Sequence, residues 1–206
     1  MRRSGLAASR GGPRHPRSAD PWAERARREG YPARSVYKLQ EIDERLGLFE
    51  PGQRVLDLGA APGSWSLYAL KRIGPEGSLL AVDLTPLGVQ LPLPGAFRRA
   101  DVFEMDLADL EPFDVVLSDM APATSGQRAL DQARSAALFE AALGLAERLL
   151  RPGGHFVGKL LQGPDLQTLR ARLRAGFQSE RLVRPRATRA DSTEIFLVGL
   201  QRRETT

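Results

Sequence analysis

The sequence contains no cysteine and only two histidines, and three of its 30 basic residues are lysines, at Lys38, Lys71 and Lys159. The absence of cysteine excludes disulfides, thiolate metal ligands and a cysteine nucleophile. With His15 and His155 as the only imidazoles, no structural zinc site is expected, and we predict no metal. The absence of cysteine also fits a cytoplasmic protein. No run of about 18 consecutive apolar residues occurs, which disfavours a membrane-spanning helix.

Positive charge is concentrated at the amino terminus. The chain of 206 residues carries a net charge of +5, and residues 1–20 hold five arginines and one aspartate. Because this segment is rich in Arg, Gly, Ser and Pro, we predict a disordered arm over 1–20 and one folded domain over 21–206. The arm either contacts RNA or only aids solubility. An organellar transit peptide is disfavoured because amphipathic helical spacing is not evident.

Strand and helix signals alternate from residue 54 onward, which is typical of a parallel sheet with helices on both faces. The apolar runs that predict strands are 54–59, 78–84, 96–102, 113–119, 155–161 and 194–201. The helical patterns are 64–73, 129–150 and 165–177, and a helix over 35–47, with Ser35 as its cap and Gly47 at its end, precedes the sheet. The predicted fold is a doubly wound α/β domain.

A glycine-rich turn, DLGAAPGSW at 57–65, follows the first predicted strand. Gly59 and Gly63 allow a tight turn and a close ligand, and the next helix presents its N-terminal amides. The turn is not the G-x-G-x-x-G of dinucleotide enzymes, so hydride transfer is disfavoured. Asp83 and Asp101 end the next two strands, where carboxylates suit the ribose hydroxyls and the adenine amino group of S-adenosylmethionine. Either aspartate alone could instead be a cap or turn residue, but together they favour that cofactor.

Four further charged residues are expected on the same rim, because ligands of open α/β sheets bind at the carboxyl ends of the strands. Asp119 ends the fourth strand, Lys159 lies near the end of the fifth, and Lys38 lies in the first turn of the helix before the sheet. Glu194 begins the last strand. If that strand runs antiparallel to its neighbours, Glu194 lies beside Lys159.

These motifs together resemble the FtsJ/RrmJ family of ribosomal RNA 2′-O-ribose methyltransferases. The matching segments are ARSVYKLQEI, VLDLGAAPGSW, VDL, SDMAPATSG, RPGGHFVGKLLQG and STEIFLV. The resemblance implies a Rossmann-like class I S-adenosylmethionine-dependent methyltransferase fold, with a mostly parallel seven-stranded sheet and helices on both faces. It implies a catalytic tetrad of Lys38, Asp119, Lys159 and Glu194. It implies cofactor contacts by Gly59, Gly63, Trp65, Asp83, Asp101 and Asp119.

The sequence departs from the family pattern in two places. Ser64 stands where glycine is common, and Ala100-Asp101-Val102 replaces a more usual Gly-Asp-Phe. Neither change removes a reactive group, although we expect Ser64 to alter contacts near the methionine part of the cofactor.

The choice of lysine at the tetrad positions indicates proton chemistry. Arginine is not deprotonated in proteins, whereas a buried lysine can lose its proton near neutral pH. In the mechanistic hypothesis, Lys159 orients a ribose 2′-hydroxyl and accepts its proton, as a true base or mainly as a positioning group. Asp119 and Glu194 hold the ammonium groups, and Asp119 also contacts the methionine end of the cofactor. The alternative is that Lys159 and Glu194 form a buried structural ion pair.

Two arginine clusters flank the predicted rim and suggest a phosphate-binding track, although either could be a solvated charged face. The predicted RNA-binding residues are Arg25, Arg27, Arg28, Arg34, Arg184, Arg186 and Arg189. The resemblance implies a uridine in the peptidyl-transferase-centre loop of 23S ribosomal RNA, in the large ribosomal subunit, as the substrate of a monomer.

Other acceptors are less consistent with the sequence. Pyrimidine C5 transfer normally needs a cysteine nucleophile, and enzymes that methylate exocyclic amino groups usually carry a different motif after the fourth strand. Transfer-RNA and cap 2′-O-methyltransferases, and a non-catalytic RNA-binding assembly factor, stay open as alternatives.

Overall fold

One seven-stranded sheet, in the order β3-β2-β1-β4-β5-β7-β6, organises the protein, whose computed structural model describes residues 20–204. The strands are β1 (Arg54–Leu58), β2 (Ser78–Asp83), β3 (Gly95–Arg99), β4 (Phe113–Ser118), β5 (Leu150–Leu161), β6 (Phe177–Val183) and β7 (Glu194–Arg202). β7 pairs antiparallel with β5 and β6, and the other pairings are parallel. The predicted α/β class and the mostly parallel seven-stranded sheet are therefore confirmed.

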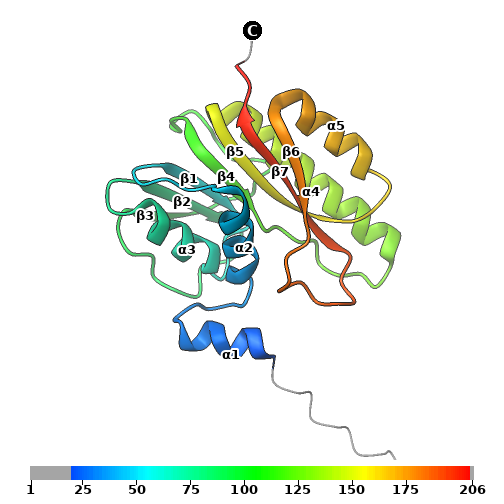
Figure 1. Ribbon diagram of the computed structural model, residues 1–206, viewed down its shortest axis with the longest axis horizontal. Coiled ribbons are helices and arrows are strands. Elements are labelled where there is room, and N and C mark those ends of the chain that lie inside the picture. The colour runs from blue at the N-terminus through cyan, green and yellow to red at the C-terminus, as the bar shows by residue number, and fades with distance from the viewer. Residues whose placement is uncertain (1–19, 205–206) are drawn as a thin grey trace, which may run out of the picture.

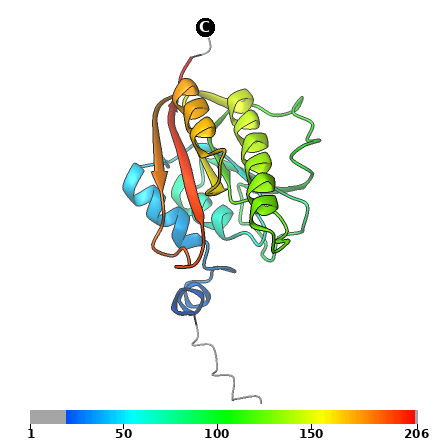
Figure 2. The same cartoon turned by 90° about the vertical axis from the view of Figure 1, so that its right-hand side faces the viewer.

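Helices cover both faces of the sheet (Figures 1 and 2). They are α1 (Pro21–Arg28), α2 (Val36–Leu46), α3 (Ser64–Ile73), α4 (Arg128–Leu149) and α5 (Leu166–Gly176). The core of α2 and α3 lies on one face and the core of α4 and α5 on the other. Figure 1 shows α1 below α2, on the side where the loop between β6 and β7 lies. Within residues 20–204, no helix is both long and apolar enough to cross a membrane.

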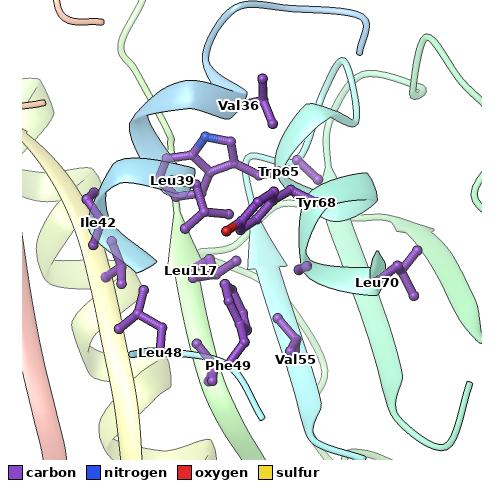
Figure 3. Close-up of a cluster of buried hydrophobic side chains, with 14 of the residues drawn as sticks. Val36, Leu39, Ile42, Leu48, Phe49, Val55, Trp65, Tyr68, Leu70 and Leu117 are labelled. Carbon is purple, nitrogen blue, oxygen red and sulfur yellow. The ribbon is translucent and has the colours of Figure 1, made fainter. Parts of the chain in front are cut away.

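The helix α2 presents an apolar stripe to the sheet, as its sequence predicts. Val36, Leu39 and Ile42, spaced three apart, are all fully buried against α3 and the central strands (Figure 3). Burial of each such side chain contributes about 1.5–3 kcal/mol to folding. The helix ends at Gly47, whose φ of +64° is readily adopted by glycine. This packing fixes the side of α2 that carries Lys38.

A buried carboxylate fastens α2 to its surroundings. Asp43 is 3% exposed and accepts hydrogen bonds from the Leu48 amide (3.0 Å) and the Tyr68 hydroxyl (2.7 Å). It also pairs with Arg72 Nε at 2.9 Å. Since Tyr68 and Arg72 belong to α3, Asp43 holds α2 and α3 together.

The second glycine in GHFVGKLL, residues 154–161 of β5, explains how this strand orients Lys159. A Cβ atom on Gly158 would lie 2.6 Å from Phe139 of α4, so only glycine allows this close helix-to-strand contact. Successive residues of a strand point to opposite faces. Lys159 therefore points away from α4, toward the face that α2 and α3 cover.

Two elements were not predicted from the sequence pattern. The helix α1 begins with Asp20 as N-cap, which accepts from the Trp22 amide, and Pro21 at its first position. That combination is a helix-start signal in the sequence. The edge strand β6 has a mostly polar sequence, FQSERLV, without clear alternation. The predicted basic arm lies outside the described residues, except Asp20.

Candidate active site

A cavity of about 420 Å³ opens at the carboxyl ends of β1, β2 and β4. Four of the predicted cofactor residues line it: Gly59, Asp83, Asp101 and Asp119. The lining residues that were not predicted as cofactor-binding are Ala61, Leu84, Thr85, Ala100, Val102, Phe103, Met120, Ala121 and Leu138. The cavity thus combines three carboxylates with apolar walls, which is the composition of a site for an amphipathic ligand.

The turn after β1 is shaped by the main chain and by Asp83. Gly59 has φ +73°, and a Cβ atom there would lie 2.5 Å from Met120 Cγ. Asp83 accepts from the Ala61 amide at 2.9 Å and from the Thr85 amide at 2.7 Å. The carboxylate therefore holds the turn together and also lines the cavity. The structural role of Asp83 is thus observed, and its binding of a ligand stays a prediction.

Asp101 combines the same two features. The strand β3 ends at Arg99, so Asp101 lies in the loop after it, where it accepts from the Phe103 amide at 3.0 Å. It also lines the cavity. Phe103 beside it is 62% exposed and also lines the cavity.

Three residues of the turn motif face away from the cavity. Gly63 is the N-cap of α3, at φ +109°. Trp65 is 2% exposed and donates to the Ser35 carbonyl at 2.9 Å. The Ser64 hydroxyl bonds to the Ala33 main chain, accepting from its amide at 2.8 Å and donating to its carbonyl. The Ser64 hydroxyl thus joins α3 to the segment before α2, and Ser64 is not among the residues that line the cavity. Its expected effect on contacts near the methionine part of the cofactor stays a prediction.

The four predicted tetrad residues converge from four separate elements and form two ion pairs. Lys159 Nζ lies 2.9 Å from Asp119 Oδ1, and Lys38 Nζ lies 2.6 Å from Glu194 Oε1. Lys159 is 8% exposed, and both Lys38 and Glu194 are 12% exposed in their side chains. The pairing differs from the prediction, in which Glu194 accompanied Lys159.

The register of β5 and β7 explains this pairing. Lys159 lies opposite Phe196, and Glu194 lies opposite Leu161, two residues further along. The Phe196 ring therefore stands beside Lys159, and its centre is 5.9 Å from Lys38 Nζ. The Lys159–Asp119 pair borders the cavity, because Asp119 lines it. In the Lys38–Glu194 pair, the lysine belongs to α2. The site holds two ammonium groups and two carboxylates around one aromatic ring.

Asp57 is a buried acid that the sequence analysis quoted but did not assign. It lies in β1 and is fully buried; its Oδ2 accepts from the Ser66 hydroxyl at 2.6 Å, and its Oδ1 has no hydrogen-bond partner. Burial raises the pKa of Asp57 to about 7, opposed by the Ser66 hydrogen bond and assisted by the charges of Asp119 and Asp83. The feature of the sequence that could have singled out Asp57 is an acidic residue inside an otherwise apolar strand.

Several predicted RNA-binding arginines have structural contacts. Arg25 pairs with Glu29 at 2.7 Å and lies over the Tyr37 ring. Arg184 donates to the main-chain carbonyls of Ala190 and Ser192, at 3.3 and 2.7 Å, and so holds the loop between β6 and β7 closed.

The other predicted arginines differ in exposure. Arg27, Arg28, Arg186 and Arg189 are exposed, and Arg34 pairs with Asp20 at 2.6 Å. Of the seven, Arg34 and Arg189 line a cavity together with Lys38 and Glu194 of the tetrad. Their binding to RNA stays a prediction.

The strand order and the cavity at the carboxyl edge of the sheet define a class I methyltransferase fold. Two solved structures share the fold. A Plasmodium falciparum protein named as a ribosomal RNA methyltransferase aligns with TM-score 0.73 and 23% identity, over 85% of this chain and all of that one. A Clostridium thermocellum protein named as an rRNA methylase aligns with TM-score 0.56 and 14% identity, over 81% of this chain and 97% of that one.

The sequence specifies the family. Residues 31–202 match the FtsJ-like methyltransferase family, and the chain belongs to it. A relative from Sorangium cellulosum, named ribosomal RNA large subunit methyltransferase E, is 52% identical over 93% of this chain and 92% of its own length. A relative of the same name from Syntrophobacter fumaroxidans is 46% identical over 90% of this chain and 96% of its own.

Proposed function

We propose that this methyltransferase transfers a methyl group from S-adenosylmethionine to a ribose 2′-hydroxyl of ribosomal RNA. The proposed target is a uridine in the peptidyl-transferase-centre loop of 23S RNA, methylated in the large ribosomal subunit by a cytoplasmic monomer. One observation carries the proposal: a buried lysine, Lys159, is paired with Asp119 at the edge of the cavity, and a second lysine pair lies beside it. The name of the relatives that are 46–52% identical supports ribosomal RNA as the substrate class.

The residues of the cavity fit S-adenosylmethionine, which supplies an activated methyl group. Asp83 offers carboxylate oxygens to ribose hydroxyls, and Asp101 offers an acceptor to the adenine amino group. The exposed Phe103 ring suits an adenine face. Asp119, which lines the cavity, offers a carboxylate to the cationic methionine end. No residue of the cavity offers a cysteine or histidine for an alternative chemistry.

The tetrad then performs alignment and proton transfer. Lys159 Nζ donates a hydrogen bond to orient the 2′-oxygen or, in its neutral form, accepts the proton as the new O–C bond forms. Asp119 fixes the position of Lys159, and Glu194 fixes Lys38. Alignment of the two reacting groups is worth up to about 7–11 kcal/mol of the barrier. Proton acceptance is the part that lysine can supply at this position and arginine cannot.

Substitution of Lys159 tests the proposal. We expect Lys159→Arg and Lys159→Met to bind S-adenosylmethionine as the wild type does, measured by calorimetry, and to lose at least about 100-fold in methyl transfer, the usual contribution of a positioned base. Lys71→Arg is the matched control, because Lys71 is exposed on α3. An arginine variant with wild-type activity would exclude proton acceptance by Lys159.

The substrate is tested by mapping. Labelled methyl transfer to large subunits from a methylase-deficient host should modify one ribose, whereas subunits from an untreated host should accept little. Preferential methylation of transfer RNA or of capped RNA would replace the proposed substrate. Binding of the cofactor with no transfer to any RNA would favour an assembly factor.

A further inference from the structure

A second cavity, of about 320 Å³, lies between the start of α2 and the loop that joins β6 to β7. We call it the basic pocket. Its lining residues are Ala33, Arg34, Ser35, Lys38, Arg189, Ser192 and Glu194. It shares no lining residue with the cofactor cavity, but it contains the Lys38–Glu194 half of the tetrad. A ligand here therefore lies next to the reacting groups without displacing the cofactor.

The charges of the basic pocket suit an anion. Arg34 is already paired with Asp20, and Lys38 with Glu194. The Arg189 guanidinium makes no ion pair or hydrogen bond to any other residue within 20–204. An entering anion thus meets one unpaired guanidinium and two shared cations. A guanidinium fork matches the oxygens of a phosphate in a bidentate manner.

The walls of the pocket are fixed before any ligand arrives. On one wall, the Ser64 hydroxyl holds the Ala33 main chain, and Trp65 holds the Ser35 carbonyl. On the other wall, Arg184 closes the loop that carries Arg189.

That loop is also fastened to α2. The Arg186 amide donates to Glu41 at 2.7 Å, and the Glu194 amide donates to the Ser192 hydroxyl at 3.1 Å. Because both walls are already ordered, binding costs little conformational entropy.

We propose that the basic pocket binds a backbone phosphate of the RNA next to the target ribose, with Arg189 as the main ligand and Arg34 as the second. This inference rests on the proposed function, which puts the target 2′-hydroxyl at Lys159. In RNA, the 3′-phosphate is attached to the carbon next to the one that bears the 2′-hydroxyl. Lys159 and Lys38 flank the same Phe196 ring. In this proposal, the phosphate next to a ribose held at Lys159 extends past the Phe196 ring to Lys38 and the basic pocket.

The first experiment measures RNA binding by the full-length chain. A labelled single-stranded RNA of the target-loop sequence is titrated at several salt concentrations. We expect Arg189→Gln to weaken binding about tenfold and to lower the slope of log K against log salt by about 0.7, the contribution of one phosphate on a single strand. Arg189→Lys should recover much of both, since it restores the charge. Arg148→Gln is the control, because Arg148 is exposed at the far end of α4.

The second experiment identifies the phosphate. The phosphate 3′ to the target ribose is replaced by an uncharged methylphosphonate. This RNA should bind the wild type about tenfold more weakly than the unmodified RNA does. The Arg189→Gln variant should bind the two RNAs with nearly the same affinity. Additive losses, or an Arg189→Gln variant with wild-type affinity and slope, would overturn the inference. Cofactor binding by the variant should be unchanged.

Methyl transfer separates this inference from the proposed function. If the wild type transfers a methyl group to the ribose and Arg189→Gln has unchanged KM for large subunits, the pocket assignment fails alone. If the wild type transfers none but the Arg189 effects on RNA binding and salt slope persist, the proposed function fails and the phosphate site stands.

Discussion

Replacement of Asp57 by asparagine should remove a pH-dependent loss of stability. Asp57 is fully buried in β1, one of its oxygens has no hydrogen-bond partner, and burial raises its pKa to about 7. In the unfolded chain the carboxyl titrates at about 3.9. Between these two values the folded protein keeps a proton that the unfolded chain has released.

The sign and size follow from this difference in proton binding. Stability from the protonated carboxyl is fully present below about pH 4 and is lost as the pH rises through the folded-state pKa of about 7. In that interval the free energy of unfolding falls by about 1.4 kcal/mol per pH unit. The whole loss is of the order of 4 kcal/mol, of which about 3 kcal/mol falls between pH 5 and pH 8.

Urea unfolding of the wild type and of Asp57→Asn at pH 5 and pH 8 measures the effect. Relative to the variant, the wild type should lose about 3 kcal/mol between the two pH values. His155 titrates in both proteins, so its contribution cancels. Ser66→Ala should extend the loss to higher pH, because the Ser66 hydroxyl opposes the rise in the pKa of Asp57. Parallel pH dependence in the wild type and Asp57→Asn would refute this reasoning.

Two further predictions concern the turn and α2. Gly59→Ala should destabilise the protein by about 1–3 kcal/mol and weaken cofactor binding, because a Cβ atom at φ +73° would displace Met120 from the cavity wall. A wild-type cofactor affinity measured by calorimetry would contradict this prediction. Asp43→Ala should cost about 3 kcal/mol in urea unfolding, since it leaves buried donors without an acceptor. Arg72→Ala should cost under about 1 kcal/mol, because Arg72 is 49% exposed.

The strands of the central sheet could be predicted because parallel strands buried on both faces read as short apolar runs. β1, β4 and the end of β5 lie where 54–59, 113–119 and 155–161 predict them. β6 could not be predicted in this way, because an edge strand buries little and its sequence carries no clear apolar pattern. The start of β5 was missed because Pro152 and the glycines after it read as a turn, although the structure pairs Leu150 with Phe113.

The positions of the predicted strand ends indicated which charged residues come together, but not which lysine pairs with which carboxylate. Lys38, Asp119, Lys159 and Glu194 converge as expected, yet the partner of each lysine depends on register and side-chain reach. The same limit applies to Ser64, whose sequence position does not reveal which side of the turn its hydroxyl faces.

The two lysine ion pairs differ in composition from all the others in the described part of the chain. Every other ion pair between residues 20 and 204 uses an arginine. If Lys38 and Lys159 only balanced the charges of Glu194 and Asp119, arginine would be the expected choice here too. A positive charge is therefore not the whole requirement at these positions. Two properties distinguish lysine from arginine: a compact head group and the ability to release its proton. The Lys159→Arg variant separates charge from proton release, provided that its cofactor affinity shows that the larger head group has been accommodated.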